Sequence, residues 1–261
     1  MDLGISGRRA LVLGGNRGIG FGIAQALARE GVDLAIAARD ESRLAEAAQA
    51  LRATGARIEA ARIDLERVET LPAFAKDLSE RFGTIDILVN NTGGPAYGGA
   101  ANRSAKEWSD RFQDMVLSVI TLTDCLLTEM RRRRWGRIIT VVSSGVIQPI
   151  PILGISNTLR ASLVTWSKTL SAEIASDGVT ANILVPGRID TERVRLTDEA
   201  TGKQQGISLE EVRKRSIAAI PLGRYGRVEE VGATAAFMAS AQASYMTGAI
   251  VRVDGGIVRS W

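Results

Sequence analysis

A cluster of glycines near the amino terminus supplies the first residues in this sequence that could do chemistry. Gly14, Gly15, Gly18 and Gly20 lie within seven residues, between the apolar run at 10–13 and a stretch whose apolar residues have helical spacing. Glycine lets a backbone approach a ligand closely, and a helix start offers free N–H groups and the positive end of its dipole. The pattern predicts a phosphate site, although its spacing differs from the G-x-G-x-x-G form. The alternative is an ordinary glycine-rich turn.

Two arginines could read the ribose 2′ position of a bound dinucleotide; the alternative for Arg39 is a solvated arginine at a helix start. Arg39 ends the second expected strand, roughly 20 residues after the glycine turn, where dinucleotide folds keep the group that does this. Arg17 lies inside the glycine loop and adds a second positive charge. Because a guanidinium binds phosphate oxygens in two places, the pair favours NADP(H) over NAD(H). Asp40 keeps NAD(H) open, since its carboxylate could accept a free 2′-hydroxyl.

Polar residues also follow the third and fourth expected strands. Asp64 could accept a hydrogen bond from an adenine amino group, or it could cap the next segment. The fourth strand runs into residues 90–95, NNTGGP, whose small side chains would let the backbone pass against a cofactor. The alternative for that segment is a polar turn that closes a strand.

Few residue types in this chain can act as a general acid or base, because the sequence has no histidine and one cysteine, Cys125. Catalysis by Ser-His or Cys-His pairs, imidazole acid–base work and HExxH metal sites are therefore excluded. A single cysteine also excludes an internal disulfide and a thiolate cluster, and we expect no metal site. Any proton donor must be tyrosine, lysine, aspartate, glutamate, cysteine or water.

The elements that must position these residues alternate between strand and helix along the whole chain. Such alternation predicts one doubly wound α/β (Rossmann) domain over residues 1–261, with a parallel sheet of about seven strands and helices on both faces. Ligands in that fold bind beyond the carboxyl ends of the strands. The expected strands are 10–13, 34–38, 57–63, 85–90, 137–143, 180–185 and 249–253, and the expected helices lie near 18–30, 41–53, 68–82, 105–132, 155–176, 209–218 and 228–239.

The bulk composition is that of a soluble globular protein, with 45% hydrophobic and 24% charged residues. The formal charge is only +4, which calls for neither nucleic acid nor membrane as a partner. The basic run at 131–134 is expected to be the solvated end of a helix. The first residues lack the apolar core of a signal peptide, so a cytoplasmic location is expected.

Together these motifs resemble the short-chain dehydrogenase/reductase family, in the branch containing the 3-oxoacyl-(acyl carrier protein) reductases. Residues 14–20 match the family's TGxxxGIG segment, with Leu13 replacing the threonine, and residues 90–93 match its NNAG segment. Residues 186–191, PGRIDT, match the segment after the sixth strand, and residues 248–256 match the last strand and turn. The resemblance covers essentially the whole length.

The resemblance implies that these segments line a nicotinamide dinucleotide, with residues 189 and 191 at the nicotinamide carboxamide. The complete set of expected cofactor residues is Gly14, Asn16, Arg17, Gly18, Ile19, Gly20, Arg39, Asp64, Leu65, Asn91, Thr92, Gly93, Arg160, Pro186, Gly187, Ile189 and Thr191.

The resemblance also implies a catalytic tetrad of Asn, Ser, Tyr and Lys, and three of its four positions are changed. The serine is Ser143, but Ser156 holds the tyrosine position, Arg160 the lysine position and Met115 the asparagine position. An aliphatic hydroxyl is a poorer acid than a phenol and does not reach as far. Arg160 can hold ribose hydroxyls or stabilise an oxyanion, but it stays protonated and cannot relay protons. Ser143, Ser156 and Arg160 are the candidate catalytic residues.

Two functions remain open on these residues. The first is a slow or non-standard NADP(H)-dependent oxidoreductase on a carbonyl or alcohol, with the proton supplied by water or another acid. Tyr97, just past the NNTGGP segment, is one candidate for that acid, or else an apolar lid residue. The second is a catalytically impaired NADP(H)-binding protein that works as a sensor or partner subunit. Non-redox chemistry is a third, which nothing in the chain specifies.

The charged segment at about 188–221 corresponds, in the resemblance, to a lid over the substrate, and its length predicts helices of its own. The alternative is a plain surface insertion. The resemblance further implies a small-molecule or acyl-thioester substrate and a homotetramer or homodimer.

Overall fold

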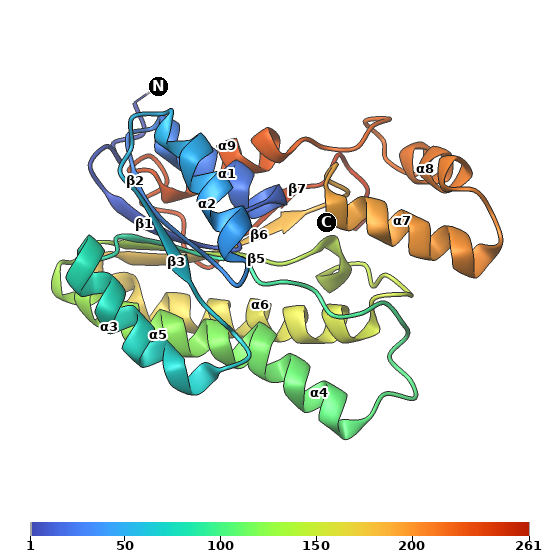
Figure 1. The fold of residues 1–261 in the computed structure, drawn as a ribbon, viewed down its shortest axis with the longest axis horizontal. Coiled ribbons are helices and arrows are strands. Elements are labelled where there is room, and N and C mark those ends of the chain that lie inside the picture. Colours follow the sequence, from blue (N-terminus) through green and yellow to red (C-terminus); the bar gives the residue numbers. More distant parts are fainter. Residues whose placement is uncertain (1, 261) are drawn as a thin grey trace.

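One seven-stranded parallel sheet organises the computed structural model, which describes residues 2–260 (Figure 1). The strand order is β3-β2-β1-β4-β5-β6-β7, so the direction of winding reverses between β1 and β4. All seven expected strands are confirmed, with boundaries that shift by one or two residues. They are β1 Arg9–Leu13, β2 Asp33–Ala38, β3 Ile58–Arg62, β4 Ile87–Asn90, β5 Gly136–Val141, β6 Val179–Pro186 and β7 Ile250–Val253.

Helices cover both faces of the sheet, as Figure 1 shows. One face carries α1 (Gly18–Arg29), α2 (Glu41–Arg52) and α9 (Val228–Ala239). The other carries α3 (Leu71–Phe82), α4 (Ala105–Phe112), α5 (Ser118–Arg132) and α6 (Gly154–Ile174). This is the doubly wound arrangement that the sequence predicts.

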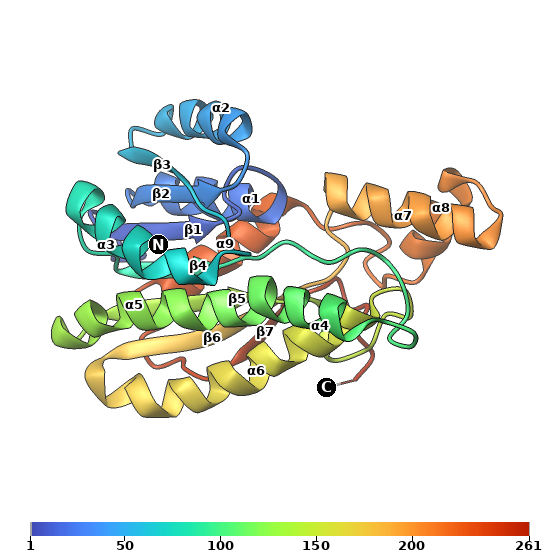
Figure 2. The same ribbon diagram turned by 60° about the horizontal axis from the view of Figure 1, so that its bottom comes forward.

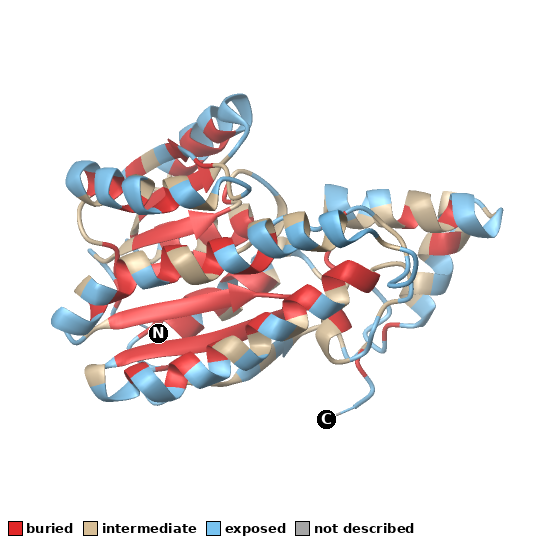
Figure 3. Ribbon diagram, turned by 90° about the horizontal axis from the view of Figure 1, so that it is seen from below, coloured by how far each residue is buried: buried red, intermediate tan, exposed pale blue. Residues whose placement is uncertain are grey.

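The apolar run of β1 is continuous because both of its faces are buried. Ala10 and Val12 face a core shared with α1, α2 and α9, whereas Leu11 and Leu13 face a core shared with α3 and α5. Successive side chains of a strand point to opposite faces, so a strand between two helical layers must be apolar at every position. Figure 3 shows the strands buried and the outer sides of the helices exposed.

The helical segment expected near 105–132 is confirmed, although it is not one regular α-helix. A π-helical turn, Gln113–Leu117, separates α4 from α5. Such a turn inserts an extra residue into the hydrogen-bonding ladder and is frequent at functional sites. It contains Met115, the residue at the expected asparagine position. Short 3-10 turns also open the 68–82 segment, at Val68–Thr70, and follow α6, at Ala175–Asp177.

Two helices stand outside the layers and project beyond the carboxyl ends of the strands (Figure 2). They are α7 (Glu192–Gln205), for which the sequence predicts only helix of unspecified bounds within 188–221, and α8 (Leu209–Ala218), which was expected. Buried Asp198 holds α7 to the body, since it pairs with Arg188 and accepts a 2.7 Å hydrogen bond from the Tyr225 hydroxyl. Throughout residues 2–260, every helix is too short or too polar to cross a bilayer.

Candidate functional site

The glycine loop between β1 and α1 has the geometry that its sequence predicts. Gly14 and Gly18 have φ angles of 61° and 55°, a left-handed conformation that other residues adopt only with strain. A Cβ on Gly20 would lie 2.1 Å from the Gly14 carbonyl oxygen, so any side chain there would collide with the loop. Asn91, beyond β4, steadies the loop by donating from Nδ2 to the Leu13 carbonyl at 3.1 Å.

The start of α1 is left open for an anion. Its N-cap, Arg17, makes no side-chain capping hydrogen bond, and the first turn contains no acidic residue. The first N–H groups of the helix therefore have no side-chain cap, and the positive end of its dipole is not neutralised. Thr191 lies over this turn, with its Cγ2 3.6 Å from the place where a Gly18 Cβ would be. An open helix start under a glycine loop is the arrangement that binds a pyrophosphate.

Arginines surround the adjoining edge beyond β2. Arg39 donates to Glu66 at 3.0 Å, and Arg17 donates to Glu192 at 2.6 Å. Asp40 accepts a 3.1 Å hydrogen bond from the backbone N–H of Arg43 and so caps α2. One oxygen of Asp40, the residue that could accept the free 2′-hydroxyl of NAD(H), is thus used to cap α2.

Asp64 and Leu65 lie at the end of β3. Asp64 Oδ1 accepts from the backbone N–H of Glu66 at 3.1 Å, which is a contact within the turn, whereas Arg67 is the N-cap of the 3-10 turn that follows. Leu65 packs against the core beneath α3. The adenine-binding role expected of Asp64 would use its other oxygen.

Arg160, on α6, is buried at the ends of β4 and β5. Its guanidinium donates to the carbonyls of Val141, Thr92 and Gly93, each at 3.1 Å, and from Nε to Ser156 Oγ at 3.3 Å. These bonds use four of its five N–H groups and leave one, on Nη1, for a ligand. Burial lowers the pKa of Arg160 to about 10, which leaves the group charged at neutral pH.

Ser143 and Ser156 both keep a hydroxyl hydrogen for a ligand. Ser143 Oγ, at the end of the β5 segment, accepts from the backbone N–H of Gly145 at 3.2 Å. Ser156 is buried and accepts from Arg160. Because each oxygen acts as an acceptor in its described bond, each O–H can donate elsewhere. Met115 is buried in the same apolar cluster as Ile155 and Leu159 of α6.

Within residues 2–260, none of the three tyrosine hydroxyls forms a hydrogen bond with Ser143, Ser156 or Arg160. Tyr97 OH lies 3.0 Å from Thr197 Oγ1 of α7, so it contacts the projecting helices as the lid alternative for this residue implied. Tyr225 donates to Asp198, and Tyr245 is fully exposed.

The remaining expected cofactor residues follow β6. Pro186 ends that strand, and the Gly187 N–H donates to the Val253 carbonyl at 2.9 Å. Ile189 is buried in the core under α1 and α9. Thr191 caps α7 by accepting from the backbone N–H of Val194 at 3.4 Å. The sheet thus brings the segments after β1, β4, β5 and β6 together at its carboxyl edge, with Arg39 and Asp64 further out.

Sequence reasoning gave no role to Asp114, which lies in the π-helical turn. It pairs with Arg111 at 2.7 Å, and its Oδ1 is buried without a hydrogen-bond partner. Burial raises the pKa of Asp114 to about 6, although Arg111 opposes that rise. Its position in an interruption that side-chain periodicity does not mark explains why the sequence did not reveal it. Thr92 Oγ1 is likewise buried without a partner.

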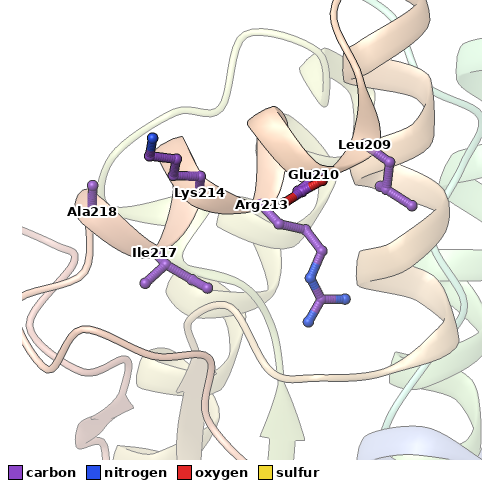
Figure 4. Close-up of a pocket in the computed structure, with 6 residues that line it drawn as sticks. All are labelled: Leu209, Glu210, Arg213, Lys214, Ile217 and Ala218. Atoms are coloured by element: carbon purple, nitrogen blue, oxygen red, sulfur yellow. The ribbon is translucent and has the colours of Figure 1, made fainter.

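Two surface hollows lie near these elements. One, of about 450 Å³, is bordered by Asn16, Arg17 and Phe21 on one side and Arg43 and Glu46 on the other. The other, of about 810 Å³, lies along α8, where Arg213 and Lys214 extend in different directions (Figure 4). The second hollow is lined by none of the expected site residues.

Comparison with known proteins agrees with this geometry. Residues 14–258 match the family model described as enoyl-(acyl carrier protein) reductase. The chain is 33% identical over 258 residues to the 3-oxoacyl-[acyl-carrier-protein] reductase of Salmonella typhimurium, covering 98% of this chain and 99% of that one. It is 32% identical over 251 residues to the protein of the same name from Chlamydia muridarum, covering 96% and 97%.

Solved structures give the same picture. L-sorbose reductase from Gluconobacter frateurii, complexed with NADPH and L-sorbose, superposes with a TM-score of 0.94 at 31% identity over the whole of both chains. Actinorhodin polyketide ketoreductase with NADPH superposes with a TM-score of 0.92 at 30% identity, covering 97% of this chain and 98% of that one. The family match, these relatives and the glycine loop agree, and the chain belongs to the short-chain dehydrogenase/reductase family.

Proposed function

We propose that this chain binds NADP(H) and transfers hydride slowly between that cofactor and a carbonyl or alcohol substrate. The glycine loop is the observation that supports cofactor binding. The Gly14 carbonyl oxygen occupies the space that a side chain on Gly20 would need, and the start of α1 has no side-chain cap. This geometry fits a dinucleotide pyrophosphate.

The preference for NADP(H) over NAD(H) is supported by the charges beyond β2. Arg17, Arg39 and Arg43 lie on that side, whereas Asp40 caps α2 with one of its oxygens. A 2′-phosphate gains from guanidinium forks, while a free hydroxyl needs a carboxylate. The NADPH named in the solved L-sorbose reductase and ketoreductase complexes is in line with this choice.

In this proposal, Ser143, Ser156 and Arg160 bind and polarise the substrate carbonyl, and none of them acts as the general acid. NADPH, when bound, supplies the hydride that adds to the carbonyl carbon. Ser143 and Ser156 donate their free hydrogens to the oxygen on which negative charge develops. Arg160 strengthens the donor power of Ser156 because its positive Nε–H donates to the same oxygen. Water supplies the final proton, and the loss of general acid help, typically about 10²–10⁴-fold, makes the turnover slow.

The segment at 188–221 acts as the substrate lid in this proposal, since α7 and α8 project at the carboxyl edge and Tyr97 contacts α7. A small molecule or an acyl thioester is the proposed substrate, in keeping with the names of the relatives. A cytoplasmic homotetramer or homodimer belongs to the same proposal.

A second candidate is an NADP(H)-binding protein without turnover. It is favoured by Arg160, whose guanidinium is mostly occupied by backbone carbonyls rather than left for a reacting group. Both candidates are tested by NADPH fluorescence titration followed by stopped assays with ketones and 3-oxoacyl thioesters. Turnover that falls in Ser143→Ala supports the oxidoreductase. Tight NADPH binding with no turnover on the panel supports the second candidate, and no NADPH binding contradicts both.

A further inference from the structure

The carboxylate of Glu192 joins three elements that border the proposed nucleotide site. Its Oε2 lies 2.6 Å from Nη1 of Arg17 in the glycine loop and 3.1 Å from Nη1 of Arg43 in the first turn of α2. Glu192 is itself the first residue of α7. The lid helix is therefore tied at its start to the loop and helix that lie beside the ribose position.

One carboxylate oxygen between two guanidinium groups is the arrangement that a phosphate oxygen makes. Among residues 2–260, Glu192 is the acid paired with Arg17, and Arg43 also lies 3.5 Å from Asp40. Glu46 borders the same hollow. The cationic pair thus has an internal anion in place before any nucleotide arrives.

We propose that Glu192 stands in for the nucleotide's 2′-phosphate, so that NADP(H), but not NAD(H), takes Arg17 and Arg43 from it and releases the first turn of α7. The inference rests on the proposed function. By this exchange, the first turn of α7 responds differently to NADP(H) and to NAD(H).

The energetics favour exchange in this direction. The side chains of Arg17, Arg43 and Glu192 are 59%, 43% and 43% exposed, so each pairing is a surface ion pair that stabilises weakly. A phosphate monoester carries a charge of about −1.5 to −2 and three acceptor oxygens, and it therefore competes well against one carboxylate.

The release stays local because α7 has independent anchors, which begin at Arg193, whose Nη2 donates to the Pro95 carbonyl at 2.9 Å. Asp198 pairs with Arg188 and accepts from Tyr225, and Thr197 contacts Tyr97. In the first turn, the Val194 N–H donates to Thr191 Oγ1 and the Arg195 N–H to the Thr191 carbonyl. Those two amides should report the change, while the amides after Asp198 should not.

The first experiment measures backbone hydrogen exchange of the full chain with adenosine 2′,5′-bisphosphate or with 5′-AMP, two probes that differ only in the 2′-phosphate. We expect the bisphosphate to speed exchange of the amides of Val194 and Arg195 severalfold and 5′-AMP to leave it unchanged. Equal effects of the two probes, or protection of these amides by the bisphosphate, would overturn the proposal.

The second experiment measures the Kd of both probes, and of NADPH, for Glu192→Gln. The matched control is Glu199→Gln, which removes an acid paired with Arg195 on the same helix. Loss of the competing charge should lower the Kd of the bisphosphate and of NADPH threefold to tenfold in Glu192→Gln, with 5′-AMP and the control unchanged. Unchanged or weaker bisphosphate binding in Glu192→Gln contradicts the inference alone, whereas a wild-type chain that binds neither NADPH nor the bisphosphate contradicts the proposed function.

Discussion

The glycine loop and the Arg160 region lie at the same edge of the sheet but differ in whether the chain itself already uses their hydrogen-bond donors. At the start of α1, backbone donors have no side-chain cap, and the glycines let the loop pack closely where a side chain would collide with the chain. Around Arg160, the donors are used by the chain, in four hydrogen bonds to the ends of β4 and β5 and to Ser156. The donors of the first region have no side-chain partner, whereas those of the second are bonded within the chain.

The contrast indicates that the glycine loop and the Arg160 region can change independently of each other. Binding depends on backbone geometry, which the glycines and the switch in winding between β1 and β4 supply. Proton transfer depends on a few side chains, which substitution can remove without disturbing the sheet.

The largest effect is expected from restoring the family's acid to the reaction half. Ser156→Tyr combined with Arg160→Lys should raise kcat for a carbonyl substrate by about 10²–10⁴-fold, since a phenol donates a proton and a nearby ammonium lowers its pKa. Steady-state NADPH oxidation measures this. Arg160→Lys alone should give no such gain. A folded, NADPH-binding double variant that is no faster than wild type would show that more than the acid is missing.

The next effect concerns the binding half. Gly20→Ala should weaken NADPH binding by about 100-fold or more, because its Cβ would lie 2.1 Å from the Gly14 carbonyl oxygen and the loop would have to move. Fluorescence titration gives the Kd. Gly99→Ala is the control, since a Cβ there meets nothing within 4 Å. Equal affinity of the two variants would remove the glycine loop from the proposed site.

Arg160→Ala should lower the free energy of unfolding by about 2–4 kcal/mol, because it takes the guanidinium donor away from the carbonyls of Val141 and Thr92, which are buried residues, and of Gly93. Urea unfolding measures the change. Arg132→Ala, which removes an exposed arginine paired with Glu129, should cost less than about 0.5 kcal/mol. A loss in Arg160→Ala as small as in the control would mean that the bonds of this guanidinium contribute little to stability.

The smallest effect concerns Asp114, which feels the charges of both Arg39 and Arg160. Its pKa in the folded protein, about 6, exceeds the ordinary value of 3.8, so ionisation costs stability as the pH rises through that interval and the cost is complete above pH 6. Asp114→Asn should therefore stabilise the protein by about 1–2 kcal/mol at pH 8.

That gain should shrink toward zero as the pH falls below the ordinary value of 3.8, where the carboxyl is protonated in both states. Thermal unfolding across this range measures the dependence. Asp110→Asn, at a more exposed acid paired with Lys106 on α4, should show no comparable trend. A gain for Asp114→Asn that does not vary with pH would have a cause other than ionisation.

Much of the fold could be predicted because strands buried on both faces appear in the sequence as continuous apolar runs. β1 and β5 are examples, with nearly every side chain inside. The π-helical turn Gln113–Leu117 could not be predicted, since helical periodicity passes through it almost unchanged. The bounds of α7 could not be predicted either, because this helix buries an acid, Asp198, and has no apolar stripe that would mark it in the sequence.

The candidate site divides in the same way. The glycine loop follows from residue type and spacing, because only glycine fits its geometry. The pairing of Glu192 with Arg17 joins residues 175 positions apart, and the bonds of Arg160 reach back to Thr92 and Gly93. Contacts of that kind depend on how the finished elements pack and leave no local pattern.

The bonding of Arg160 bears on the entropy of nucleotide binding. By linking the segments after β4 and β5, its guanidinium constrains both segments without any ligand. Segments that are already constrained lose little further freedom when a ligand binds. Calorimetry of NADPH binding should accordingly show a smaller ordering penalty in the wild type than in Arg160→Ala, even where the two affinities are close.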